Sequence, residues 1–126
     1  MRSAGKTQFP ATGYMEAKIS EKNNATIFTL SGRLDSHSAP LFEEQVNAYL
    51  TSPATHLVLN FNNLDYISSA GLRVILNTAR AYKPTPYQFI TCSMQDHVQE
   101  VFEISGFDSF ITICGSLDES LTTLQD

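Results

Sequence analysis

The sequence predicts a single α/β domain with a mixed, mainly parallel sheet of four to five strands and about four helices. Segments of strand periodicity alternate with segments of helical periodicity in the order β-β-α-β-α-β-α-β-α, which is typical of parallel strands joined by helical crossovers. The chain has 126 residues, a length that fits one domain and suffices to bury a substantial core.

Two strands open the domain. Residues 14–19 alternate between apolar and polar side chains, as expected of a strand at the edge of a sheet, and residues 26–32 form a second strand. The link between them is short and rich in turn-forming residues, which predicts an antiparallel hairpin. Residues 1–12 are rich in Gly, Pro, Ser and Thr and are expected to form a flexible tail before a domain spanning residues 13–126.

A helix and a buried strand follow. Ser38 is expected to cap this helix, Pro40 lies in its first turn, and the acidic residues 43–44 favour its positive end. Residues 56–61 form a nearly continuous apolar run, as expected of a central strand covered on both faces. Residues 62–66 are predicted to turn the chain, and their aspartate and tyrosine either shape that turn or contact a partner.

The second half of the chain alternates helices and strands. Its first helix begins within "ISSAGLRVIL" (residues 67–76), where apolar side chains recur at helical spacing, and it ends at the proline-rich segment 83–86. The remaining elements are a strand at 87–92, a helix at 93–106 capped by Ser93 and closed near Gly106, a short strand within 107–113 and a last helix at 116–125.

The charge and composition exclude several classes of partner. The net charge is −5 and the eight basic residues are scattered, so nucleic acid and anionic membrane surfaces are not favoured partners. No run of 18 or more apolar residues would span a membrane, and the N-terminus lacks the apolar stretch of a secretory signal. These features predict a cytoplasmic protein.

Cysteine and histidine do not point to a metal or a cofactor. Cys92 and Cys114 lack the spacing of a metal site or of a redox pair and are expected to be buried, reduced thiols. His37, His56 and His97 lie far apart in sequence, and no pair has metal-ligand spacing. Neither a metal nor a cofactor is therefore expected.

The paired serines Ser68 and Ser69 raise a question of chemistry. A serine at the start of a helix accepts a hydrogen bond from an unpaired amide, so capping is the simplest interpretation. A nucleophilic serine needs a nearby base, and the chain has neither the G-x-S-x-G elbow of a hydrolase nor a phosphate-binding glycine loop. The residues alone therefore do not predict an enzyme.

Four segments together resemble the STAS family, the sulfate-transporter and anti-sigma-factor-antagonist domains. "LDYISSAGLRVIL" (64–76) is similar to the family's D-S-S-G-L or D-S-T-G-L segment, and "LSGRLDSHSA" (30–39) is similar to its G-x-L-D segment. "HLVLNFNNL" (56–64) and "SGF" (105–107) resemble the flanking strand and the C-terminal pattern. The resemblance covers residues 14–125 and implies a single STAS domain.

The resemblance implies a regulatory function by partner switching. In the family's anti-sigma-factor antagonists, the unphosphorylated protein binds an anti-sigma factor that is also a serine kinase, and this binding releases the sigma factor. Phosphorylation of one serine then abolishes binding, and a serine phosphatase restores it. The chain is accordingly expected to be a phosphoprotein of transcription regulation and a kinase substrate, not an enzyme.

Residue by residue, the resemblance places Ser69 at the phosphorylated position. Ser68 falls where many antagonists carry Asp, so a neutral hydroxyl replaces a carboxylate; phosphorylation of Ser68 itself is the alternative. Asp35 matches the aspartate of the G-x-L-D segment. The expected partner-binding residues are Gly32, Arg33, Asp35, Ser68, Ser69, Ala70, Gly71, Leu72 and Arg73.

Other functions remain open at this point. A STAS domain that is never phosphorylated would be a scaffold or a sensor of a small molecule or nucleotide, with Ser69 as a helix cap only. A hydrolase using Ser69 would need a base from a distant segment. A transporter tail would need a membrane span elsewhere. We expect a monomer, because partner docking needs the face around Ser69 to be free.

Overall fold

The computed structural model describes residues 15–51 and 53–124, and these residues form a five-stranded sheet with the order β1-β2-β3-β4-β5. β1 and β2 pair antiparallel as a hairpin, and every other neighbouring pair is parallel, which confirms the predicted mixed, mainly parallel sheet. The strands are β1 (Met15–Lys22), β2 (Ala25–Leu34), β3 (His56–Ile67), β4 (Phe89–Cys92) and β5 (Thr112–Cys114).

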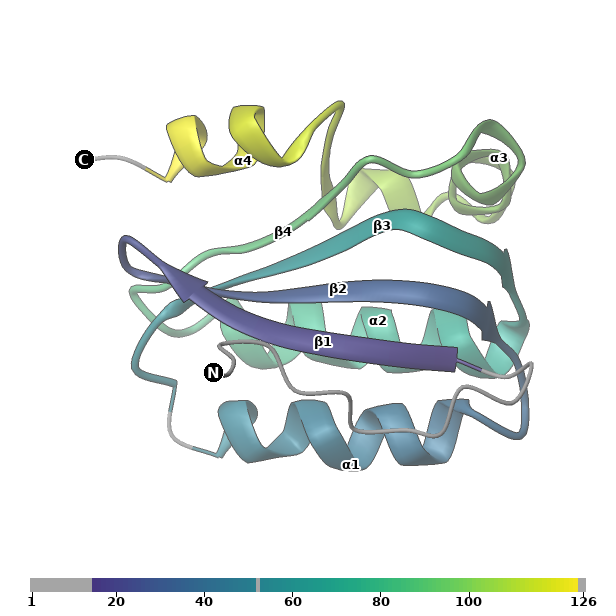
Figure 1. Cartoon of the computed structure of the whole chain (residues 1–126), viewed down its shortest axis with the longest axis horizontal. Helices are drawn as coiled ribbons and strands as arrows, with labels where there is room; N and C mark the ends of the chain where they lie inside the picture. Colours follow the sequence, from purple (N-terminus) through teal and green to yellow (C-terminus); the bar gives the residue numbers. More distant parts are fainter. Residues whose placement is uncertain (1–14, 52, 125–126) are drawn as a thin grey trace.

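The helices cover both faces of the sheet. α1 and α2 lie side by side beneath it in Figure 1, α4 lies on the opposite face, and α3 lies beside one end of β3. The helices are α1 (Ala39–Leu50), α2 (Ser69–Tyr82), α3 (Asp96–Ser105) and α4 (Leu117–Thr123), with a short 3-10 turn, η1, at Phe107–Ser109. None of the described helices is long and apolar enough to cross a membrane.

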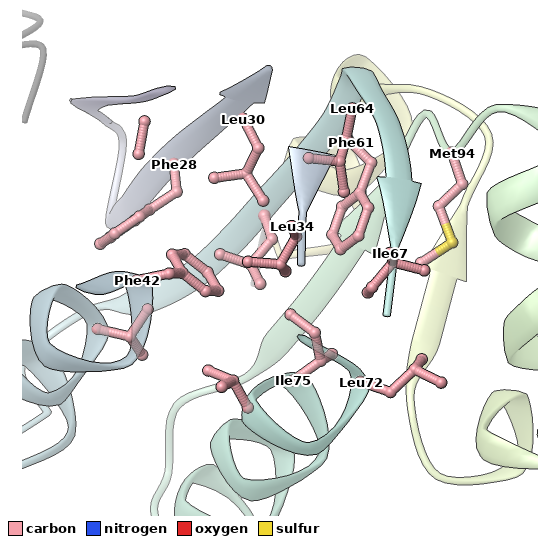
Figure 2. Packing of buried hydrophobic residues seen from close by; sticks show 14 of the residues in the cluster. Phe28, Leu30, Leu34, Phe42, Phe61, Leu64, Ile67, Leu72, Ile75 and Met94 are labelled. Carbon is pink, nitrogen blue, oxygen red and sulfur yellow. The ribbon is translucent and has the colours of Figure 1, made fainter. Parts of the chain in front are cut away.

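Two apolar clusters hold these layers together. The larger one lies between the sheet and helices α1, α2 and α3; Figure 2 shows Phe28, Phe42 and Ile75 directed into it. The smaller one joins strand residues to the leucines of the last helix, which are Leu117, Leu121 and Leu124. It also contains the buried free cysteines Cys92 and Cys114. Each fully buried large apolar side chain contributes about 1.5–3 kcal/mol to folding.

The prediction of a turn at residues 62–66 is wrong, because β3 continues without interruption to Ile67. Leu64 and Ile67 are buried while the polar residues between them are exposed, so the segment has one core face and one solvent face. Its backbone pairs with β2 as far as Leu34, with register shifts at Thr29/Ser31 and Gly32/Arg33. Gly32, which has a φ of 96°, therefore serves a bulge in a strand and not a tight turn.

Ser38 occupies the N-cap position of α1 as predicted, but its side chain does not cap the helix. The Ser38 hydroxyl makes no capping bond; it donates to the Arg33 carbonyl at 2.8 Å and accepts from the Asp35 amide at 3.0 Å. Pro40 lies in the first turn as predicted. The acidic residues 43–44 lie beyond that turn, because the helix begins at Ala39.

The helix predicted at 93–106 is shorter than expected. Ser93 does not cap it: this residue has a φ of 60°, and its amide donates to the Cys114 carbonyl at 3.1 Å. α3 spans Asp96–Ser105 and is closed as predicted by Gly106, whose φ of 80° is the left-handed conformation that glycine adopts easily. The predicted tail at 1–12 lies outside the described residues.

Candidate functional site

The predicted site residues meet where the carboxyl ends of two neighbouring parallel strands lie next to the start of α2. β2 and β3 pair as far as Leu34 and Ile67, so the segments that follow them begin at the same edge of the sheet. The Ser68 amide donates to the Leu34 carbonyl at 2.9 Å, which fixes the start of α2 to the end of β2. Figure 2 shows Leu34, Ile67, Leu72 and Ile75 gathered at this junction.

Ser68 is the N-cap of α2. Its hydroxyl accepts a hydrogen bond from the Gly71 amide at 3.2 Å, and its backbone is extended, as a capping residue requires. The side chain is half-buried. Ser68 thus has a structural task that occupies its oxygen.

Ser69 has a different environment from its neighbour. It is the first helical residue of α2 and is exposed, and its hydroxyl forms no hydrogen bond with any residue in 15–51 or 53–124. The first amides of a helix have no acceptor inside the helix. The Ser68 side chain accepts from the Gly71 amide, whereas the amides of Ser69 and Ala70 have no acceptor within those ranges. Free amides and the positive end of the helix dipole make this position able to accommodate a phosphate.

Gly71 allows α2 to begin this close to the sheet. A Cβ at this position would lie 2.8 Å from the Leu34 Cγ, and 3.0 Å from both the Ile67 Cγ1 and the Leu34 carbonyl oxygen. Real Cβ atoms essentially never approach as closely as the first of these distances. Glycine at this position is therefore explained by packing. Leu72, with 8% of its surface exposed, also packs into the core.

Asp35 forms a compact loop immediately after β2. Its Oδ1 accepts from the amides of His37 at 3.0 Å and Ser38 at 3.1 Å, and from the Ser38 hydroxyl at 3.3 Å. The hydrogen bond from the Ser38 amide, supported by the other two, holds the pKa of Asp35 below its usual value against the opposing effect of partial burial. Asp35 therefore provides a fixed negative charge at this edge at neutral pH.

Arg33 and Tyr66 form an exposed pair beside this loop. They are register partners on β2 and β3, and the Arg33 guanidinium lies over the Tyr66 ring, 4.2 Å from its centroid. Tyr66 remains 39% exposed. The composition of residues 62–66 predicts a turn, so a pair between Arg33 and Tyr66 is not expected from the sequence. The pairing of β3 with β2 continues to residue 67 and brings the two side chains together.

The start of α3 completes the same edge, which the sequence does not predict. The Gln95 Nε2 donates to the Asn62 carbonyl and to the Asp65 Oδ1, both at 3.3 Å. The His97 Nε2 is hydrogen-bonded to the Asp65 carbonyl. Polar backbone groups of the extended β3 are thus tied to α3, and no spacing in the sequence indicates that link.

The structure brings the predicted residues of β2 and α2 to one edge of the sheet, and it leaves Arg33, Ser69 and Arg73 exposed. No group of three or more His, Cys, Asp or Glu side chains among the described residues is arranged to hold a metal. No base is hydrogen-bonded to Ser69 in this part of the chain, although a nucleophilic serine requires one. The arrangement is chemically suited to accepting a phosphate.

The sequence matches the STAS domain family over residues 14–120. A protein of Bordetella bronchiseptica, BtrV, whose name describes it as an anti-sigma factor antagonist, is 35% identical over 102 residues, covering 81% of this chain and 88% of the relative. A solved anti-sigma factor antagonist from Mycobacterium paratuberculosis superposes with a TM-score of 0.83 at 19% identity, covering 94% of this chain and 100% of the other.

One further structural neighbour was solved in two covalent states. The anti-sigma factor antagonist SpoIIAA in its unphosphorylated form matches with a TM-score of 0.72 at 19% identity, covering 83% of this chain and 92% of the other. The phosphorylated form, from Bacillus, matches with a TM-score of 0.68 at 17% identity, covering 86% and 99%. At these identities the two structures establish the likeness of the fold.

Proposed function

Because the chain belongs to the STAS domain family, we propose that it is an anti-sigma factor antagonist that works by partner switching, with Ser69 as the phosphorylated residue. The unphosphorylated protein binds an anti-sigma factor with serine kinase activity, and phosphorylation of Ser69 releases it. A serine phosphatase restores binding. The observation that carries this proposal is the exposed, unbonded Ser69 hydroxyl beside a neighbouring serine whose oxygen is occupied.

Electrostatics supports a switch that leaves the fold intact. Phosphorylation adds about −1.5 to −2 charges, and the positive end of α2 tolerates them. The same charges repel an acidic partner surface and are costly to remove from water. A change of about 2.7 kcal/mol in binding free energy suffices for a hundredfold loss of affinity.

The serine at position 68 is compatible with this proposal. Asp and Ser are both good N-caps, so Ser68 preserves the cap that an aspartate would form. What the chain lacks is a negative charge next to the acceptor hydroxyl, and we expect this difference to affect the rate of phosphorylation. Phosphorylation of Ser68 itself is disfavoured, because it would remove the cap of α2.

The remaining parts of the proposal concern location and assembly. We propose that the protein is a cytoplasmic monomer, since the exposed face around Arg33, Ser69 and Arg73 must be free for the partner. Its partners are proteins, and neither nucleic acid nor a membrane is proposed. The protein binds and is modified, and it does not itself catalyse a reaction.

Binding measurements with charge variants test this function. Ser69→Asp should lower affinity for the serine-kinase anti-sigma factor at least tenfold, whereas Ser69→Ala should bind persistently in the presence of ATP. Thr122→Asp, which adds the same charge on the exposed side of α4, is the matched control and should bind normally. Equal binding by Ser69→Asp and the control would contradict the switch and favour a phosphorylation-independent scaffold or sensor.

A further inference from the structure

A groove lies at the carboxyl end of α2, away from the site around Ser69. Its volume is about 590 Å³, within the range of about 300–1,000 Å³ typical of small-molecule sites. We name it the α2–η1 groove. It is lined by Leu76, Ala79, Arg80, Tyr82, Lys83, Tyr87, Gln88, Phe89, Phe107, Ser109, Phe110 and Thr112.

Aromatic side chains make up five of the twelve residues that line the α2–η1 groove. Tyr82 and Phe89 form its buried part, while Tyr87 and Phe107 are half-buried. Phe110 is 69% exposed, so most of a large apolar ring at the groove is open to solvent. Aromatic rings contribute large apolar contact areas and favour edge or stacked contacts with other rings, which suits a ligand with a flat aromatic body.

Among the described residues that line the groove, Arg80 and Lys83 are the only charged ones, and none is a carboxylate. Neither cation forms an ion pair within the part of the chain that the structure describes. Cations are favoured at the carboxyl end of any helix, so the charges alone would not indicate a ligand. The two cations, however, line a groove that also holds an exposed aromatic ring, and they do so in a protein whose net charge is −5. It is this combination of positive charge, aromatic surface and groove that indicates a ligand.

From this combination we propose that the α2–η1 groove binds a small organic anion with an aromatic body. The rings hold the apolar part, and Arg80 and Lys83 bind the carboxylate, sulfonate or phosphate group. The 14 residues of α2 span about 20 Å at about 1.5 Å per residue, and Ser69 lies at the other end of the helix. The proposal therefore stands independently of the function of Ser69.

The probe for this site is anilinonaphthalene sulfonate, a fluorescent aromatic anion. Titration of the folded protein, followed by fluorescence and by backbone-amide NMR, should show saturable one-to-one binding. The amide signals that shift should be those of Gln88, Ser109 and Thr112. Shifts confined to residues elsewhere, or binding without saturation, would overturn the proposal.

Variants separate the contribution of charge from that of apolar contact. Arg80→Gln combined with Lys83→Gln should weaken binding of the probe about tenfold or more, and it should leave binding of the neutral analogue phenyl-naphthylamine unchanged. Lys18→Gln combined with Lys22→Gln removes two exposed charges from β1 and is the matched control. Phe110→Ser, at an exposed position, should weaken both probes. Wild-type affinity of the double variant for the anionic probe would overturn the proposal.

Discussion

The Ser68 hydroxyl accepts a hydrogen bond from the Gly71 amide at 3.2 Å, and this contact separates the tasks of two adjacent serines. Ser68 closes the first turn of α2. Ser69 lies between the two bonded residues with its hydroxyl exposed and unbonded within the described ranges, 15–51 and 53–124. The proposal that Ser69 is phosphorylated depends on this difference.

Removal of the two hydroxyls one at a time should affect stability unequally. Ser68→Ala should lower the free energy of unfolding by about 0.5–2 kcal/mol, because the Gly71 amide loses its acceptor. Ser69→Ala should change it by less than about 0.5 kcal/mol, as expected of an exposed side chain whose hydroxyl has no hydrogen bond within the described residues. Urea unfolding of both variants measures the difference. The opposite order would mean that Ser69 is the structural cap.

Gly71→Ala should destabilise the protein by about 1–3 kcal/mol, although alanine is intrinsically favoured over glycine in helices by about 1 kcal/mol. The added methyl group would lie 2.8 Å from the Leu34 Cγ, and it would force the start of α2 away from the sheet. Asn77→Ala, at an exposed position of the same helix, is the control and should not destabilise. Thermal or urea unfolding of the pair decides whether packing or helix propensity dominates.

Asp35 should make stability depend on pH. Its pKa is lower in the folded protein than the usual value, so its carboxylate stabilises the fold above the ordinary pKa of about 3.9. That stabilisation is lost as the pH falls through the lower pKa of the folded state. Asp35→Asn should therefore be less stable than the parent at pH 7, and the gap should close in acid.

A direct titration checks the cause of this shift. NMR of the Asp35 carboxyl should give a pKa below the usual range. Because the Ser38 amide and hydroxyl both donate to this carboxylate, Ser38→Ala should raise the pKa through loss of the hydroxyl bond. An unshifted pKa in the parent protein would contradict the hydrogen-bonded geometry of the loop.

The Arg33–Tyr66 pair should contribute little to stability and more to binding. A cation–π contact at an exposed site is worth about 0.5–1 kcal/mol, so Arg33→Gln should destabilise by no more than that. If the partner docks on this edge, the same variant should lower affinity for the anti-sigma factor. Lys18→Gln removes an exposed charge from the edge strand β1 and is the control. Urea unfolding of the two variants measures the change in stability, and calorimetric titration with the anti-sigma factor measures the change in affinity.

Local patterns in the sequence predicted much of the fold. The hairpin of β1 and β2 followed from alternation and a short link, and the stripe that includes Leu72 and Ile75 predicted the buried face of α2. The start of that helix at the paired serines was also correct. In each case the signal lies within one element, where the side-chain period and the capping residues are visible in the chain itself.

Features that depend on distant parts of the chain could not be read in this way. The Asn-rich segment at 62–66 has the composition of a turn, but pairing with the end of β2 holds it in a strand. Ser38 and Ser93 both precede helices, yet Ser38 bonds to the end of β2 and the Ser93 backbone bonds to Cys114. Tertiary hydrogen bonds took precedence over local capping preferences at both positions.

The site shows the same division. The order of residues around Ser69 indicated which hydroxyl to propose as the phosphate acceptor only through resemblance to a family, because both serines are reasonable caps from sequence alone. The bond from the Gly71 amide to Ser68 distinguishes them. Tyr66 contacts Arg33 and Gln95 contacts Asp65 only because β3 extends to Ile67. No short motif in the sequence encodes the length of this strand.

The most direct test of the central claim is intact-mass analysis after incubation with ATP and the serine-kinase anti-sigma factor encoded nearest to this protein's gene. The parent protein and Ser68→Ala should each gain one phosphate, mapped to Ser69 by peptide fragmentation, and Ser69→Ala should gain none. An unmodified parent protein, with the kinase shown to be active on another antagonist, would contradict the switch. Modification that persists in Ser69→Ala would contradict the assignment of the residue.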